Sequence, residues 1–522
     1  MPSKSSILYQ NHNATIFLID IPTSIAVAQE LSLPQTPPNV FSDTKPNFNQ
    51  PVPGEHDQRK YLVSTPPLKT PYPPSSEPKT EAAKARVLAR IPHSERVVAE
   101  TIEPLLSVTL GEIRSSYRQG SDWCLPRCSV PGESADSEYE RGTSTGVAGV
   151  RRKRMRADET PTAHNEEYRF LPGEQAIKPA DGSISQPPLI LSPGLNRFEY
   201  RGELCNLIVK NTSLETATVT ACCSYSSNKP SRDTKQGYSR PQLQGHTFII
   251  PPLSNFLLCN LPISTPSPAS SNHPCQTNPI PNLPQTQKFN LILLDPPWSN
   301  KSVRRSRHYQ TQSYSDSELL TQKICDILTV HSHTPSSFMD EEMDMNSENQ
   351  SNLSIAAIWI TNSTKARNAA YDSLTGAGFS ICEEWIWVKT TIDGEPVTPI
   401  SGLWRKPYEV LVIGKKQQQQ HAVFSASDSD SGILRRVIAA VPDVHSRKPN
   451  LREVFERVFF VDDGPGSDSS LGMLGSSACG IRYSALEVFA RNLTAGWWAC
   501  GNEVLKFNSE EWWIDGSFIL IP

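Results

Sequence analysis

The chain alternates short apolar runs, typical of buried strands, with segments of helical periodicity. Predicted strands cover residues 15–19, 204–210, 218–224, 246–250, 255–259, 289–294, 356–360, 380–389, 410–413 and 485–489. Predicted helices begin near Thr23, recur within 81–117, and cover 363–376 and 451–459. Strands that alternate with helices predict an α/β fold with a parallel sheet.

One predicted strand runs into a stiff polar turn. Leu291–Leu294 is continuously apolar and is followed by Asp295, Pro296, Pro297 and Trp298. Proline cannot continue a strand ladder, so the strand must stop at Asp295. Because ligands of open α/β sheets bind at the carboxyl ends of strands, Asp295 is predicted to lie at a binding site.

This turn suits an exocyclic amine conjugated to a purine ring. The Asp295 carboxylate and the Pro296 carbonyl would accept its two N–H bonds and localise the nitrogen lone pair, and Pro297 would stiffen the turn. Trp298 offers a face for base stacking, worth roughly 1–3 kcal/mol. A sulfonium methyl donor would then need only in-line placement. The alternative is a buried strand that simply ends in a Pro-rich turn.

Composition indicates that the chain is unevenly ordered. Of 522 residues 45 are Pro and only 37% are hydrophobic, so several stretches cannot bury enough apolar surface to stay folded. We expect a short ordered segment (1–30), a linker (31–80), a helical segment (81–117), a mostly disordered segment (118–195) and a catalytic domain (196–522). Four low-complexity insertions are expected in that domain, at 262–287, 331–353, 415–431 and 464–480.

Charge, cysteine content and targeting signals limit the expected ligands and cellular location of the protein. The net charge of −4 indicates no overall affinity for nucleic acid, so such binding must come from local patches. The eleven Cys include no CxxC pair or zinc-like spacing, so no metal site is predicted. No segment reads as a signal peptide or membrane span, and we expect a soluble intracellular protein. The basic run 151–156 is either a nuclear-localisation patch or a solvated charge run, and we expect the nucleus, with the cytoplasm open.

Five segments occur in the order found in a known family. They are Asp295–Ser306, Trp385–Thr390, Lys406–Gly414, His445–Pro449, and Leu486–Asn492 with Gly496–Trp497 and Gly501–Val504. Together the chain resembles the DPPW family of adenine-N6 methyltransferases, named for the seventy-kilodalton subunit of the mRNA adenosine methyltransferase. More narrowly it is similar to the branch called methyltransferase-like protein four. The resemblance covers roughly residues 250–508 and implies a Rossmann-like S-adenosylmethionine-dependent methyltransferase fold.

The resemblance also implies a donor site for S-adenosylmethionine. Lys448 matches a lysine that meets the methionine carboxylate, a natural partner for a cation. Asn260 stands where the family usually has an acidic residue near the donor adenine. The implied donor set is Asn260, Asp295, Lys448, Glu487, Arg491, Asn492, Asn502 and Glu503. Without the family, ordinary surface charge would explain Lys448 and Arg491. The chain has no GxGxxG loop, so no dinucleotide cofactor is expected.

The acceptor side is predicted from the basic stretch that follows Trp298. Its cations and tyrosine would grip phosphates and stack a base, whereas the alternative is a solvated basic loop. The candidate acceptor residues are Lys301, Arg304, Arg305, Tyr309, Trp404, Lys406 and Glu409. A base within a duplex cannot reach such a pocket, so the target adenine is expected to be single-stranded or flipped out.

We therefore predict S-adenosylmethionine-dependent N6-methylation of adenine in nucleic acid. The resemblance implies RNA first, notably 2′-O-methyladenosine in a small nuclear RNA, with DNA adenine as the alternative. A hypothesis of another class is a non-catalytic RNA-binding scaffold subunit. Relatives of that kind lose the Asp or the aromatic residue of the turn, and this chain keeps both. The sequence indicates no membrane and no particular protein partner.

Overall fold

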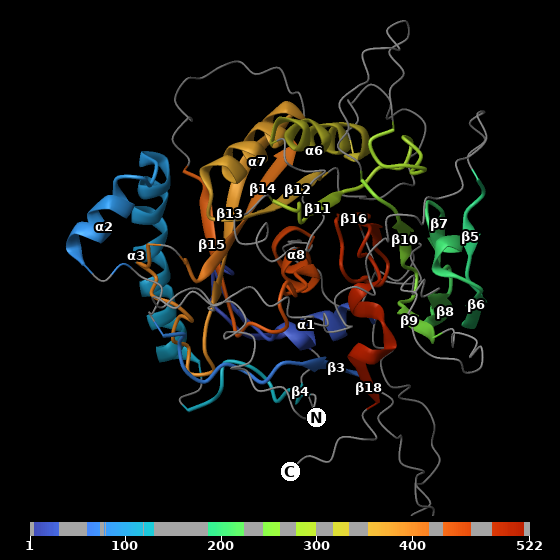
Figure 1. Ribbon diagram of the computed structural model, residues 1–522, viewed down its shortest axis with the longest axis horizontal. Helices are drawn as coiled ribbons and strands as arrows, with labels where there is room; N and C mark the ends of the chain where they lie inside the picture. The colour runs from blue at the N-terminus through green and yellow to red at the C-terminus, as the bar shows by residue number, and fades with distance from the viewer. Residues whose placement is uncertain are drawn as a thin grey trace, which may run out of the picture.

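The structure is a computed structural model of the chain, and its central feature is one large mixed sheet (Figure 1). It describes residues 5–30, 60–73, 78, 80–117, 120–129, 186–223, 244–261, 278–298, 317–333, 353–403, 405–416, 432–460 and 483–515. Within these residues, no helix is long and apolar enough to cross a membrane.

The large sheet has twelve strands among the described residues. In spatial order they are β1 (Ile7–Gln10), β2 (Ile16–Ile19), β15 (Leu434–Ala440), β13 (Phe379–Lys389), β14 (Tyr408–Lys416), β12 (Ile355–Ile360), β11 (Leu291–Leu294), β16 (Ala485–Val488), β17 (Trp498–Gly501), β10 (Asn255–Leu258), β7 (Ile208–Lys210) and β5 (Leu189–Ile190). From β2 to β10 every neighbouring pair is parallel except the two made by β14. The predicted α/β fold with a mostly parallel sheet is confirmed.

Strand β11 lies in the middle of this sheet, between β12 and β16. All four of its side chains are buried, which explains why the sequence there is apolar at every position rather than alternating. The carboxyl ends of β11, β12 and β16 lie at the same edge, since all three run parallel. The sheet therefore brings the residues that follow these strands together.

Helices cover both faces of the sheet. Helices α6 (Ser317–His331), α7 (Thr364–Gly376) and α3 (His93–Ser116) contribute to one hydrophobic core, and α1 (Ile21–Ala28) and α8 (Arg452–Phe459) contribute to the other. Figure 1 shows α6 and α7 side by side above the sheet, with α1 and α8 below them. The helix predicted at 363–376 begins one residue later, because Ser363 lies outside the helix as its N-cap residue.

The N-terminal residues are built into the same sheet. Strand β2 pairs in parallel with β15, and β1 extends the edge. Residues 81–117 form two helices, α2 (Glu81–Leu88) and α3, which are separated near Pro92, the residue before α3. Strand β15 was not predicted, and its pairing with β2 joins segments more than 400 residues apart, which no local pattern can reveal.

Two smaller sheets flank the large one. One contains β6 (Gly194–Phe198), β8 (Ala217–Cys223) and β9 (Gln244–Ile250), and the other contains β18 (Trp513–Asp515), β3 (Lys60–Ser64) and β4 (Cys128–Ser129). In sequence, the short 3₁₀ helix η2 (Arg201–Leu204) follows β6. Two further 3₁₀ helices, η5 (Lys506–Asn508) and η6 (Glu510–Trp512), precede β18.

Several sequence-based expectations need correction. The insertions predicted at 331–353 and 415–431 begin within α6 and β14, and the linker predicted at 31–80 contains β3. The strand predicted over 204–210 is shorter, because η2 precedes it and Asn206 adopts a left-handed φ of 58°, which leaves only β7. The segment 262–287 is not low-complexity insertion throughout, because Ile280 and Leu283 are fully buried in the core. Two apolar residues in a Pro-rich stretch anchor it, although the average composition is polar.

Candidate active site

The turn after β11 is held rigidly by backbone and side-chain hydrogen bonds. The Asp295 backbone N–H donates to Val488 O at 3.2 Å, which continues the parallel pairing with β16. The Trp298 backbone N–H donates to Pro296 O at 2.8 Å. The Trp298 indole Nε1 donates to Trp359 O at 2.7 Å, at the end of β12. The turn is thus fixed to both neighbouring strands.

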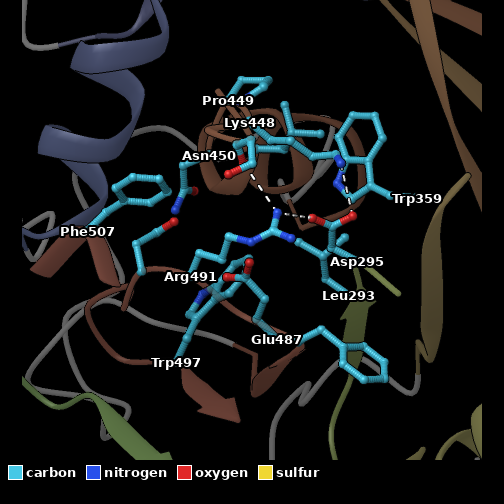
Figure 2. Close-up of a pocket in the computed structure, with 14 residues that line it drawn as sticks. Leu293, Asp295, Trp359, Lys448, Pro449, Asn450, Glu487, Arg491, Trp497 and Phe507 are labelled. Atoms are coloured by element: carbon cyan, nitrogen blue, oxygen red, sulfur yellow. Dashed lines mark hydrogen bonds and ion pairs between the residues drawn. The ribbon is translucent and has the colours of Figure 1, made fainter. Parts of the chain in front are cut away.

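Two cations from other parts of the chain meet the Asp295 carboxylate. Lys448 Nζ lies 2.9 Å from Oδ1, and Arg491 Nη1 lies 3.0 Å from Oδ2 (Figure 2). Arg491 Nη1 also donates to Ser446 O at 3.3 Å. Ser446 adopts a left-handed φ of 68°, unusual for a residue with a Cβ. Such a backbone is retained where surrounding contacts fix it, and here it directs a carbonyl at Arg491.

Lys448 also bridges to a second carboxylate. Its Nζ lies 3.1 Å from Glu409 Oε2, and Lys389 Nζ lies 2.7 Å from Oε1 of the same side chain. Burial opposes ionisation of Glu409, but the two ammonium groups outweigh it and hold its pKa well below the usual range. Burial likewise opposes the charge on Lys448, but Asp295 and Glu409 raise its pKa. Both groups are therefore charged at neutral pH.

The other side of Arg491 is held by an acidic residue. Arg491 Nε lies 3.1 Å from Glu503 Oε2, and Lys506 Nζ lies 3.5 Å from Oε1. Burial would raise the pKa of Glu503, but Lys506 and Arg491 lower it overall. The guanidinium is thus oriented between two carboxylates, which fixes the edge that it presents to Asp295.

Glu487 is a further carboxyl group beside this cluster. It lies on β16, in register with Leu293 of β11, and Figure 2 shows it on the same side as Asp295 and Arg491. Burial and the charge of Asp295 raise its pKa to about 8, even though Arg491 and Lys448 act in the opposite direction. Glu487 therefore carries a proton over much of the neutral range.

Two cavities adjoin the cluster. The first has a volume of about 30 Å³. It is lined by Leu293, Asp295, Trp359, Ser446, Lys448, Pro449, Asn450, Leu451, Glu487, Phe489, Arg491, Asn492, Trp497 and Phe507. The second measures about 360 Å³ and is lined by Asp295, Pro296, Pro297, Trp298, Trp359, Trp387, Lys389, Glu409 and Lys448, among others. Asp295, Lys448 and Arg491 line both cavities. A group transferred between ligands in the two cavities would pass this cluster.

The first cavity offers a polar group that suits a ligand. Among its described lining atoms, Asn492 Nδ2 is buried without a hydrogen-bond partner. Buried donors are normally satisfied, so this amide favours a ligand with acceptor atoms. Cations and carboxyl groups stand in the same wall, which suits a zwitterionic amino-acid moiety together with hydroxyl groups. These residue types suit the polar groups of S-adenosylmethionine.

The structure brings most of the predicted site residues together. Asp295, Lys448, Glu487, Arg491 and Asn492 line the first cavity, while Pro296, Pro297, Trp298 and Glu409 line the second. Glu503 contacts the cluster through Arg491.

Other predicted residues lie elsewhere. Asn260 and Asn502 are exposed and line neither cavity. Lys406 lines neither cavity and forms an ion pair with Glu103 of α3. The remaining candidates lie outside the described residues: Lys301, Arg304, Arg305, Tyr309 and Trp404.

Sequence reasoning missed several lining residues. Trp387 and Lys389 belong to a segment already quoted for the family resemblance, so that segment held the signal. Trp359 lies within a predicted strand and supports Lys448, whose Nζ lies 5.3 Å from its ring centroid. Tyr72 lines the second cavity from the Pro-rich segment 31–80, which the composition predicts to be a linker, and no local pattern marks it.

The site lies within a region that is similar to a known protein family. Residues 289–503 match the MT-A70 family model. The chain contains an MT-A70 domain. This confirms the family resemblance seen in the sequence, and the matched region contains Asp295, Glu409, Lys448, Glu487 and Arg491.

Relatives with related names share this region. The chain is 33% identical over 235 residues to an "N6-methyladenosine RNA methyltransferase MTA1" of Cryphonectria parasitica, covering 44% of this chain and 55% of that protein. It is 30% identical over 278 residues to the "N(6)-adenine-specific methyltransferase METTL4" of Homo sapiens, covering 52% and 46%. It is 27% identical over 225 residues to a "DNA N6-methyl methyltransferase" of Caenorhabditis elegans, covering 42% and 47%. The chain thus spans about half the length of these relatives.

Proposed function

We propose that this protein transfers a methyl group from S-adenosylmethionine to the N6 amine of adenine in nucleic acid. The observation that carries the proposal is the position of Asp295. It stands beside the fixed Pro296 carbonyl and lines both cavities, one rich in charge and one walled by indoles. The similarity to N6-adenine methyltransferases supports the same chemistry.

The acceptor amine would be held by two oxygens. A carboxylate has about four lone-pair sites, so Asp295 retains acceptor capacity while it bonds Lys448 and Arg491. The Pro296 carbonyl accepts from the Trp298 N–H and keeps a second lone pair. Two accepted N–H bonds draw the amine out of conjugation and aim its lone pair. The indole-walled cavity excludes water from the base.

The donor would occupy the charged side of the cluster. When bound, S-adenosylmethionine supplies a sulfonium methyl group. Lys448 or Arg491 would bind its carboxylate, while Glu487, Glu503 and Asn492 offer groups for its amine and hydroxyls. Once methylated, the acceptor nitrogen must lose a proton, and Asp295 is the residue placed to receive it. The chain's contribution is mainly placement, which alone can supply several kcal/mol of the barrier.

The polymer that carries the base is proposed as RNA first. The fungal relative is named an RNA methyltransferase and the nematode relative a DNA methyltransferase, so DNA adenine remains the second candidate. Nuclear localisation through the basic run 151–156 also stays a proposal, because that run lies outside the described residues. A 2′-O-methyl on the target adenosine is a finer expectation of the same kind.

The test uses the full chain and its Asp295→Ala variant. Both are incubated with labelled S-adenosylmethionine and matched single-stranded RNA and DNA oligonucleotides, with and without a 2′-O-methyl on the target adenosine. We expect N6-methyladenine by mass spectrometry from wild type, and a rate about 10²–10⁴-fold lower from the variant. Glu318→Ala is the matched control, since Glu318 is an exposed carboxylate in α6 remote from both cavities.

The outcomes separate the candidate functions. Oligonucleotide binding without any donor-dependent adenine product would refute the enzyme and favour the scaffold hypothesis. Product from Asp295→Ala at the wild-type rate would refute the role of the carboxylate. The ratio of rates on RNA and DNA then ranks the two substrates.

A further inference from the structure

Resting on the proposed function, we propose that Tyr72 is a specificity residue that contacts the acceptor base. It belongs to a segment outside the region that matches the family model. It nevertheless lines the 360 Å³ cavity together with Asp295, Trp298 and Trp387. The acceptor pocket is therefore completed by a part of the chain that precedes the domain by about two hundred residues.

The position of Tyr72 is fixed by its backbone. Its N–H donates to Val397 O at 2.9 Å, and Val397 also lines the cavity. Val397 lies in the loop between β13 and β14. Lys389 is the last residue of β13, and Glu409 is the second residue of β14. Tyr72 is therefore hydrogen-bonded to the same β13–β14 loop that supplies one wall of the pocket.

Two N-terminal segments form backbone hydrogen bonds with this β13–β14 loop. The Ile392 N–H donates to Leu68 O at 3.0 Å, four residues before Tyr72, and the Trp123 N–H donates to Ile392 O at 2.8 Å. Gly394 adopts a φ of 79°, and a Cβ at that position would stand 2.4 Å from the Trp123 ring. The turn is thus packed directly against Trp123, which leaves little freedom for the wall to withdraw from Tyr72.

The chemistry of the pocket gives Tyr72 a distinct task. Asp295 and Pro296 read the amine, but Trp298 has its indole N–H committed to Trp359 O. A half-buried phenol ring is a flat apolar surface of the kind against which a purine can stack. Stacking discriminates a base from its absence, because an abasic residue has no ring to cover. Tyr72 should therefore contribute to recognition of the base and little to binding of the donor.

The test measures base recognition without requiring turnover. Fluorescence anisotropy gives the Kd of a labelled single-stranded RNA that contains one adenosine, and of a twin with an abasic residue at that position. Wild type, Tyr72→Leu and Tyr72→Phe are compared, with S-adenosylmethionine affinity measured in parallel. Tyr200→Leu is the matched control, because Tyr200 is 48% exposed and lines neither cavity.

We expect wild type to favour the adenosine RNA over its abasic twin. Tyr72→Leu should reduce that preference between about fivefold and one-hundredfold, the range that base stacking covers. Tyr72→Phe and Tyr200→Leu should retain the preference, and donor affinity should stay constant in all variants.

Three results would overturn the inference. A Tyr72→Leu protein with the full wild-type preference would remove Tyr72 from base recognition. Equal losses for adenosine RNA, abasic RNA and donor would mean that Tyr72 only supports the fold. A wild type without any preference would refute the acceptor pocket itself, and with it the proposed function, whereas the first two results leave that function intact.

Discussion

Strand β13 carries charged side chains at its middle and at its carboxyl end, and the two clusters behave differently. At the middle, Glu383 is bound by Arg436 through two contacts, at 2.7 and 2.9 Å, and by Trp385 Nε1 at 2.6 Å. The neighbouring Glu384 is bound by Arg367, by Tyr371 at 2.9 Å and by Arg435 at 3.1 Å. These carboxylates line neither site cavity.

At the carboxyl end, Lys389 belongs to the cluster around Asp295. The Glu409 side chain is 24% exposed there, compared with 1% for Glu384. Both clusters consist of Arg or Lys paired with carboxylates, so residue type does not distinguish them. What differs is access: the carboxyl-end groups line a cavity and keep acceptor capacity, whereas Glu383 and Glu384 are already bonded to protein donors. A buried ion cluster indicates function only where a ligand can reach it.

Glu383→Ala is expected to have the largest effect on stability. It leaves Arg436 buried without its carboxylate and should lower the free energy of unfolding by about 3–5 kcal/mol. Below the melting temperature, KM values for donor and oligonucleotide should stay at wild-type levels. Urea unfolding and steady-state kinetics measure the two effects.

The double variant Glu383→Leu with Arg436→Met sharpens this prediction. Removing both charges leaves no unpaired partner, so most of the lost stability should return. A double variant as unstable as Glu383→Ala would mean that the pair contributes more than mutual neutralisation. A changed KM in either variant would contradict the assignment of this cluster to structure.

In the cluster around Asp295, Lys448→Met should act on activity rather than on folding. It removes the cation that Asp295 and Glu409 share, which should lower kcat/KM about 100-fold, or about 2.7 kcal/mol. Lys415→Met is the matched control, because Lys415 is an exposed residue of β14, the strand of Glu409. Rates near wild type for Lys448→Met would show that Arg491 alone serves Asp295.

The smallest expected effect is a pH dependence of stability through Glu487. Burial raises its pKa to about 8 in the folded protein, so folding favours the protonated form. The unfolded chain binds fewer protons between about pH 5 and about pH 8, and stability therefore falls as pH rises. Relative to Glu487→Gln, wild type should lose roughly 2 kcal/mol over this range, since water screens part of the full shift.

Urea unfolding of both proteins at several pH values checks this prediction. Glu453→Gln is a control of opposite sign, because hydrogen bonds from Ser5 and Ser6 outweigh burial and lower the pKa of Glu453. Its contribution to stability is present above the unfolded pKa and is lost as the pH falls. A constant difference between wild type and Glu487→Gln would mean that Glu487 ionises normally.

Local patterns were sufficient where the physics is local. The apolar run Leu291–Leu294 predicted a buried strand, and the prolines after Asp295 predicted its end. Both predictions are confirmed by β11 and its pairing. Helix α6 and strand β17 were not predicted. Their assignment depends on what packs around them, which a window of a few residues does not contain.

By itself, the sequence determined the stiff turn after Leu294, the α/β class and the family of residues 289–503. Apolar periodicity and proline geometry act within a few residues, and family motifs are written as residue types. Only the tertiary structure decided that Lys448 and Arg491 meet on Asp295, that Lys406 pairs with Glu103, and that Tyr72 lines the 360 Å³ cavity. These contacts join residues far apart in the chain, and the packing of the sheet selects them among many charge pairs of equal chemistry.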